Sequence, residues 1–251
     1  MALHSRHLMS VIMAVFPVTV LPMRLDYFLA HSAGLTRKEA KQLISRGAVT
    51  VEGEARPKAN LQLRDGQGVW LHGEPVQLPG HRYLMLHKPA GVVCSTDDPA
   101  HRTVLDLLPL ELRQDLHPAG RLDRDTTGLV LLTTDGQWSH RLTSPNHQCD
   151  KRYRVSCADP ISDADLQALC DGILLRGEDA PTLPARAERV DAHQLLLTIH
   201  EGRYHQVKRM LAARGNKVVA LHREQIGEIA LDADLAPGAF RLLTKGEIAS
   251  I

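Results

Sequence analysis

The sequence predicts an α+β protein in two parts: a small N-terminal α/β domain, then a larger domain in which helices flank a mainly antiparallel mixed sheet. Three features indicate this. Residues 24–78 have the pattern of two helices followed by short strands. Pro79, Gly80 and His81 form a short linker. From residue 83 onward, strand-like runs alternate with helix-like ones. We therefore expect a first domain over residues 23–80 and a second over residues 81–251.

The first domain is expected to open with a helix over Arg24–His31. A second helix runs from Thr36 to about Gly47, and Thr36 and Glu39 have the spacing of a capping box. This helix is amphipathic: one face is apolar, and the other carries the basic residues Arg37, Lys38, Lys41 and Arg46. Short strands between glycines should follow over residues 48–51, 69–71 and 75–78.

In the second domain, apolar and alternating runs predict strands over residues 83–87, 128–134, 152–157, 194–199 and 217–221. The clearest helices are Ser162–Cys170, which opens with a capping box of Ser162 and Asp165, and Tyr204–Arg214, which ends at Gly215.

Residues 1–22 fit neither domain. An apolar run over Val11–Leu21 follows Arg6, but it is too short to span a bilayer and no A-x-A cleavage site follows it. We expect an extension or disordered tail, with Met23 as the natural start, and a cytoplasmic protein that does not enter a membrane.

The composition argues against several kinds of site. The four cysteines lack C-x-x-C spacing, and His200 and His205 lie five residues apart, too far along a helix to share a face. The chain also contains neither a G-x-x-x-x-G-K-[ST] loop nor a G-x-G-x-x-G after a strand. We therefore predict no metal site and no cofactor. The net charge of +1 does not by itself indicate a nucleic-acid partner.

The densest polar segment is Gly120–Leu132, in which a turn with several charged residues leads into an apolar strand. Such a turn can hold a reactive carboxylate on a rigid support. Residues 125–128 resemble the Asp-Thr-Gly of aspartic proteases, but they have an extra threonine and the required second copy is missing. Spacing alone does not distinguish Asp123 from Asp125, and either could simply cap the turn.

The second such segment is Glu201–Leu211. From Arg203 through Arg223 the chain has six basic residues and no acidic one, so the local charge is +6. A patch of this kind suits a phosphate backbone, although a solvated basic helix would look the same.

Together these segments resemble known families. Residues 24–78, with Arg24-Leu25-Asp26 and the run Gly47–Val51, resemble the S4 RNA-binding domain. Lys88-Pro89-Ala90-Gly91, Gly120–Leu129, Lys151 with Tyr153, and Glu201–Met210 resemble the active-site motifs of pseudouridine synthases. Within that family, the form Tyr-His-Gln-Val-Lys-Arg-Met is closest to the S4-bearing branch that modifies small-subunit (16S) ribosomal RNA.

The resemblance implies a cofactor-free isomerase. It assigns Asp123 as the catalytic aspartate, Lys208 as the cation that keeps it ionised, Tyr153 as the ring that stacks on the uracil, and Arg121 as the side chain that fills the gap when the base flips out. A charge pair about 4 Å apart is worth roughly 1 kcal/mol in water and about 4 kcal/mol at an effective dielectric of 20. Further RNA-binding residues are expected to be Arg37, Lys38, Lys41, Arg46, Arg203 and Arg209.

The expected partner is 16S ribosomal RNA, either naked or in a small-subunit assembly particle, and the protein is expected to be a monomer. Two alternatives remain open from sequence: a synthase that modifies 23S ribosomal RNA, and an RNA-binding assembly factor without activity. A hydrolytic nucleosidase, which would release free uracil, is more remote.

Overall fold

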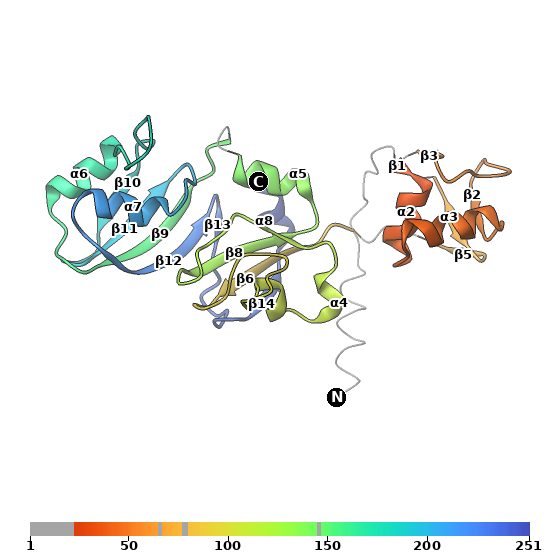
Figure 1. Ribbon diagram of the computed structural model, residues 1–251, viewed down its shortest axis with the longest axis horizontal. Helices are drawn as coiled ribbons and strands as arrows, with labels where there is room; N and C mark the ends of the chain where they lie inside the picture. The colour runs from red at the N-terminus through yellow and green to blue at the C-terminus, as the bar shows by residue number, and fades with distance from the viewer. Residues whose placement is uncertain (1–22, 65–66, 77–79, 145–146) are drawn as a thin grey trace. The chain divides into compact units, whose positions relative to one another are not determined.

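The computed structural model describes residues 23–64, 67–76, 80–144 and 147–251, and its contacts divide the chain between His81 and Arg82 (Figure 1). We call residues 23–81 the N-terminal unit and residues 82–251 the C-terminal unit. The expected tail over residues 1–22 lies outside the described residues. Among the described residues, no helix is both long enough and apolar enough to cross a membrane.

The N-terminal unit contains two helices, α2 (Leu25–Ser32) and α3 (Arg37–Ser45). Thr36 and Glu39 form the predicted capping box at the start of α3. The described residues of this unit also form five short strands: β1 (Met23–Arg24), β2 (Val49–Val51), β3 (Gln62–Leu63), β4 (Val69–Leu71) and β5 (Glu74–Pro75). The strand predicted over residues 75–78 is shifted, because β5 ends at Pro75; residues 77–79 are outside the described part.

A buried carboxylate anchors the start of this unit. The side chain of Asp26 is fully buried in α2, and Arg24 donates hydrogen bonds to its two oxygens at 3.0 and 2.9 Å. Arg37 and Lys41 of α3 approach the same carboxylate at 3.4 and 3.9 Å. Burial acts to raise the pKa of Asp26, but the hydrogen bonds from Arg24 and the charge of Arg37 outweigh burial. The pKa of Asp26 is therefore below its ordinary value. The ion pairs therefore tie the two helices together around a group that must stay charged.

The C-terminal unit is built on a mixed sheet with the strand order β10-β11-β9-β12-β8-β6-β14, to which β7 and β13 add on β8 and β12. The pairing of β8 with β12 is parallel and the other pairings are antiparallel, which confirms the predicted mainly antiparallel mixed sheet. The strands are β6 (Tyr83–Lys88), β7 (His117–Ala119), β8 (Thr127–Thr133), β9 (Lys151–Cys157), β10 (Arg186–Arg189), β11 (Gln194–Ile199), β12 (Val218–Ile226), β13 (Ile229–Ala230) and β14 (Phe240–Leu242).

Helices lie along this sheet, with α6 against β10 and α7 against β12 (Figure 1). Ser162 and Asp165 cap α6 as predicted. The prediction that the next helix begins at Tyr204 was wrong: α7 begins at Gln206, because His205 has the left-handed backbone angles φ 48° and ψ 35°. The helical elements of this unit are η1 (Val104–Leu107), α4 (Leu110–Arg113), α5 (Gly136–Thr143), α6 (Asp163–Asp171), α7 (Gln206–Ala213) and α8 (Lys245–Ala249).

One row of residues crosses the middle of the sheet. From β11 to β6, strand register places side by side Leu197, Tyr153, Arg223, Gly128 and Lys88. Gly128 has a φ of 108°, and a Cβ atom there would lie 2.3 Å from the backbone oxygen of Arg223 and 2.6 Å from its nitrogen. The parallel contact between β8 and β12 therefore requires glycine at this position.

Gly128→Ala should prevent this contact, because its methyl group meets backbone rather than a movable side chain. We expect a loss of about 3 kcal/mol or more in the free energy of unfolding. Gly136→Ala is the matched control, since a Cβ atom there meets nothing within 4 Å and alanine favours helix α5. Thermal unfolding of both variants measures the difference, and equal transitions would contradict the requirement at position 128.

Candidate active site

A cleft of about 830 Å³ lies over the middle of the large sheet. Its floor includes residues of β9, β11 and β12, namely Lys151, Tyr153, Ile199, Leu221 and Arg223. Its walls come from three places that are distant in sequence: residues 93–98, the loop 120–126 between β7 and β8, and the loop before α7. The motifs that sequence analysis singled out therefore meet in one cavity of the C-terminal unit.

Asp123 lies in this cleft between the side chains of Lys208 and His205. Lys208 Nζ of α7 donates a hydrogen bond to Asp123 Oδ2 at 2.8 Å, and His205 Nε2 lies 3.2 Å from Asp123 Oδ1. Lys208 also donates to Asp125 Oδ1 at 2.7 Å. Burial acts to lower the pKa of Lys208, but the two carboxylates outweigh it and raise the pKa above that of an ordinary lysine. An ammonium held in this way stays charged at neutral pH.

The same geometry separates the two aspartates that sequence spacing did not distinguish. The side chain of Asp123 is 27% exposed and lines the cleft, whereas that of Asp125 is 75% exposed and lies outside the cleft lining. The hydrogen bond from Lys208 holds the pKa of Asp125 below its ordinary value. Asp123, and not Asp125, is therefore the carboxylate that lines the cleft.

Two buried cations hold the loop that carries Asp123. Lys88 is fully buried, and its ammonium donates to the carbonyls of Pro89, Arg124 and Thr126 at 3.0, 3.2 and 2.7 Å. Three donated bonds use all three protons of a charged lysine. Burial lowers the pKa of Lys88, and Cys94 and the two aspartates act against that shift.

Arg223 holds the other end of the loop. Its guanidinium is buried and donates to the carbonyls of Leu129, Gly120 and Arg121 at 2.8, 3.0 and 3.4 Å. The backbone N–H of Leu122 donates to the Cys94 sulfur at 3.3 Å. From sequence, Lys88 is only part of a motif and Arg223 is only one charge of the basic run, because nothing in a single sequence signals that a cation is buried.

Tyr153 lies on the floor of the cleft and is 7% exposed. The flanking Arg152 and Arg154 point to the opposite face and are about two-fifths exposed, as strand alternation predicts. Among the described residues, no group hydrogen-bonds to the Tyr153 hydroxyl. Lys151 lies on the same face, buried, and its ammonium donates to the carbonyl of Cys149 at 2.8 Å.

Arg121 is exposed at the edge of the cleft, two residues before Asp123. Only its backbone carbonyl takes part in the bracing by Arg223. Its guanidinium forms no ion pair with a carboxylate of the described residues, so that charge is available to a substrate.

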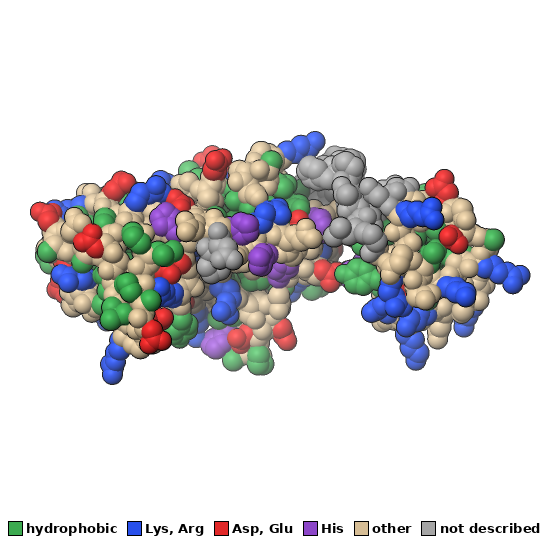
Figure 2. Space-filling model, turned by 90° about the horizontal axis from the view of Figure 1, so that it is seen from above, with side chains coloured by type: hydrophobic (Ala, Val, Ile, Leu, Met, Phe, Trp, Pro, Cys, Tyr) green, Lys and Arg blue, Asp and Glu red, His purple; other side chains and the backbone are tan. Residues whose placement is uncertain are grey.

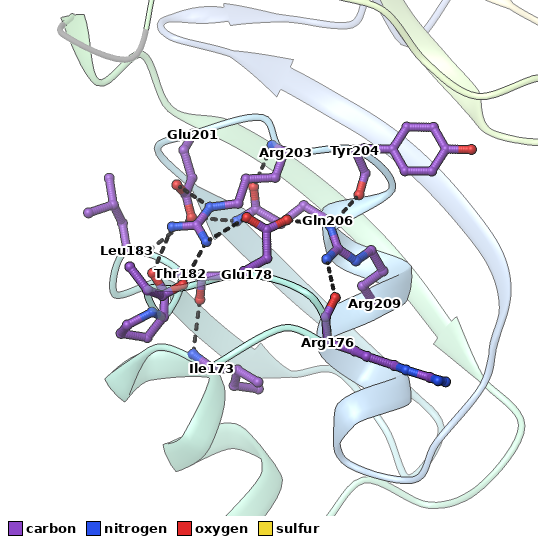
Figure 3. A network of polar contacts seen from close by, with 12 residues as sticks. Ile173, Arg176, Glu178, Thr182, Leu183, Glu201, Arg203, Tyr204, Gln206 and Arg209 are labelled. Carbon is purple, nitrogen blue, oxygen red and sulfur yellow. Dashed lines mark hydrogen bonds and ion pairs between the residues drawn. The ribbon is translucent and has the colours of Figure 1, made fainter.

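Arg203 and Arg209, which are predicted to bind RNA, lie in a network of internal polar contacts (Figure 3). Arg203 pairs with Glu201 at 3.0 Å and donates to the carbonyls of Ala180 and Pro181 at 2.8 and 2.7 Å. Arg209 pairs with Glu178 at 2.9 Å and donates to the carbonyls of Tyr204 and Arg176. These bonds tie the loop before α7 to residues 176–183. Both guanidinium groups thus have internal acceptors, and the contact of Arg203 and Arg209 with RNA stays a prediction.

Most of the other cations in the basic run over residues 203–223 also have internal partners. Lys208 is paired with Asp123 and Asp125, Arg214 with Asp165 at 2.9 Å, and Arg223 is buried on carbonyl oxygens. The local charge of +6 is therefore largely balanced by carboxylates from elsewhere in the chain.

The basic face of α3 remains exposed, and Figure 2 shows Lys and Arg side chains spread over the N-terminal unit. Arg37 and Lys41 lie near the buried Asp26. Within the described part of the chain, no carboxylate pairs with Lys38 or Arg46. Of the four basic residues of this face, Lys38 and Arg46 are therefore the two best placed to contact a phosphate backbone.

RNA binding should distinguish these two kinds of cation. Lys38→Ala and Arg46→Ala should each reduce the dependence of log K on log salt by slightly under one, because each removes one phosphate contact. Arg209→Met should leave this slope unchanged and lower the thermal stability, since it removes internal bonds. Binding titrations at several salt concentrations measure the slopes. A reduced slope for Arg209→Met would restore it as a phosphate contact.

Among the described residues, no group of three or more His, Cys, Asp or Glu side chains is placed to hold a metal ion. His200, singled out for its spacing to His205, lies with Nδ1 2.5 Å from Asp150 Oδ1, and His205 contacts Asp123. The two histidines have separate partners.

Comparison with known proteins gives consistent results. Residues 82–213 match the family model described as RNA pseudouridylate synthase, and residues 23–69 match that of the S4 domain. A protein of Vibrio cholerae named ribosomal small subunit pseudouridine synthase A is 55% identical over 91% of this chain and 99% of its own length. The protein of that name from Escherichia coli K12 is 53% identical over 91% of this chain and 100% of its own.

A solved structure titled as the crystal structure of pseudouridylate synthase is 49% identical and has a TM-score of 0.67, covering 91% of this chain and 99% of its own. The S4 match confirms the predicted nature of the first domain. The family match over residues 82–213 covers more than half of the whole sequence, and the relatives are similar to this chain over nearly their entire length. The chain therefore belongs to the RNA pseudouridylate synthase family.

Proposed function

We propose that this enzyme converts one uridine of the small-subunit (16S) ribosomal RNA into pseudouridine, with Asp123 as the catalytic carboxylate. The substrate follows from the relatives named ribosomal small subunit pseudouridine synthase A, which this chain matches over nearly their full length. The observation that carries the catalytic assignment is the position of Asp123 in the cleft, hydrogen-bonded by Lys208 and lying near Tyr153 on the cleft floor. The alternatives, a 23S ribosomal RNA substrate or a non-catalytic assembly factor, lack such support.

The reaction needs an anionic oxygen at the sugar. The bond from N1 of uracil to C1′ breaks, the base turns, a bond forms from C5 to C1′, and the proton on C5 leaves while N1 ends protonated. A carboxylate could begin this by attacking C1′, or by removing the C2′ proton to give a glycal. Both routes require unprotonated Asp123. Lys208 supplies a positive charge at 2.8 Å that favours this form.

The geometry also suggests which oxygen reacts. Oδ2 of Asp123 accepts the short bond from Lys208, whereas Oδ1 has only the longer contact of 3.2 Å with His205. In the proposal, Lys208 orients the carboxylate through Oδ2 and Oδ1 faces the sugar. Tyr153 stacks on the uracil from the floor, its hydroxyl within reach of the proton that leaves C5. Arg121, exposed at the edge, occupies the gap left in the RNA by the flipped base.

Three smaller points belong to the same proposal. The enzyme is proposed to act as a monomer. The four cysteines are free thiols, as suits the cytoplasm where ribosomes assemble. The substrate is naked RNA or a partly assembled small-subunit particle, and comparing turnover on the two identifies the better one.

Asp123→Asn should abolish pseudouridine formation and leave RNA binding within a few-fold, because the amide retains the shape of the side chain and loses its charge. The measurement is incubation of wild type and variant with 16S and 23S ribosomal RNA, followed by carbodiimide mapping. Asp125→Asn, outside the cleft lining, is the control and should remain active. Turnover by Asp123→Asn would refute the catalytic assignment. Wild-type modification of 23S RNA alone would favour the first alternative, and binding without any modification the second.

Tyr153 should act in two separable ways. Tyr153→Phe should retain substrate binding and slow a late step, because only the hydroxyl is lost. Tyr153→Leu should lose the stacking as well, which is worth about 1–3 kcal/mol per base. Single-turnover rates measured together with thermal unfolding separate this from a core role. If Tyr153→Leu kept wild-type turnover per folded molecule, Tyr153 would be a packing residue only.

A further inference from the structure

Tyr204 is the most exposed aromatic side chain of the described residues, at 75%, and it lies on the lining of the cleft. The chain is poor in aromatics, with four tyrosines, three phenylalanines and two tryptophans. An exposed ring contributes little to folding, because its apolar surface stays in water. Its position at the cleft therefore suggests contact with a ligand.

The ring is held in place from behind. It stacks on the imidazole of His205, with ring centroids 3.8 Å apart and planes 20° from parallel. His205 in turn contacts Asp123, so the stacked pair is tied to the catalytic loop. One face of Tyr204 is thus covered by His205, and the side chain as a whole remains largely exposed.

The backbone beneath the ring is also braced. The carbonyl of Tyr204 accepts a hydrogen bond from Arg209 at 3.2 Å, and the backbone N–H of Arg203 donates to Gln206 at 2.9 Å. Gln206 donates to Glu201, which pairs with Arg203. In Figure 3 the Tyr204 ring points away from this network, while its carbonyl points into it. This network holds the loop in place. It also keeps His205 in a left-handed backbone conformation, which is strained for a residue other than glycine.

A rigid aromatic ring at the edge of a cleft is a stacking platform, and every nucleobase has a flat face that fits one. The charges nearby suit a nucleic acid, since Arg121 and Arg124 are exposed on the same cleft. Tyr204 differs from Tyr153, which is 7% exposed on the cleft floor, where the target uracil is expected. A ring at the edge would meet the next nucleotide of the strand.

We propose that Tyr204, backed by His205, stacks on a base adjacent to the target uridine and thereby positions the RNA strand for flipping. The inference rests on the proposed function and adds a positioning residue to it. The stacked base is on the 5′ or the 3′ side of the uridine, and the experiment distinguishes the two.

The test uses fragments of 16S ribosomal RNA that contain the mapped uridine, with 2-aminopurine replacing either its 5′ or its 3′ neighbour. The full-length protein should quench the fluorescence of one of the two probes on binding. Tyr204→Ala should lose this quenching and bind about 5- to 150-fold more weakly, the range that corresponds to 1–3 kcal/mol per stacked base. Tyr204→Phe should retain both properties, because stacking does not need the hydroxyl.

Leu110→Ala is the matched control, since Leu110 is 77% exposed and lies outside the cleft lining. Its affinity and quenching should equal those of the wild type. Wild-type affinity and quenching in Tyr204→Ala would overturn the inference, as would a Tyr204→Phe variant as weak as Tyr204→Ala. A wild type that binds with quenching but forms no pseudouridine would overturn the proposed function and leave the stacking supported.

Discussion

The contact between Gly128 and Arg223 across the parallel strands β8 and β12 is the constraint on which the site depends. With no side chain at position 128, the two backbones approach closely, and the Arg223 guanidinium can reach the carbonyls of Gly120 and Arg121. This contact joins the β8–β6 half of the sheet to the β9–β11 half. It therefore brings the loop that carries Asp123 over the strand that carries Tyr153, although the two residues are 30 positions apart in the sequence.

Buried cations then make that loop rigid. Lys88 and Arg223 have lost their water, and the carbonyls of residues 120–129 and Pro89 replace it. A shift of the loop would leave charges buried without partners, which costs several kcal/mol for each ion. Two sets of contacts therefore fix the position of the Asp123 carboxylate. Its loop is held by the carbonyl groups that solvate Lys88 and Arg223, and the carboxylate itself is held by its hydrogen bond from Lys208. A fixed carboxylate suits a reaction in which the uracil must turn within the site while the sugar stays in place.

Local rules predicted those parts of the molecule that depend on neighbours in sequence. The capping boxes at Thr36 and Ser162 follow from spacing alone, and strand alternation alone places Tyr153 on the face opposite to Arg152 and Arg154. Spacing could not reveal that Arg209 pairs with Glu178, which lies 31 residues earlier, or that Lys88 and Arg223 are buried, because burial is decided by strands that meet only in the fold. The start of α7 was misplaced for a related reason: His205 adopts a left-handed conformation where it stacks on Tyr204 and contacts Asp123, and sequence alone gives no sign of either contact.

The balance of charge has a consequence for recognition. Since the basic run over residues 203–223 is largely neutralised within the fold and the whole chain carries only +1, long-range attraction to RNA is weak. Exposed cations that have no carboxylate partner among the described residues include Lys38 and Arg46 at α3 and Arg121 at the cleft. A few placed charges hold a backbone in one register, whereas a uniform patch would bind any RNA. Selection of one uridine must therefore depend mainly on how the strand fits the cleft, through its flat bases and its capacity to flip, with charge in a secondary role.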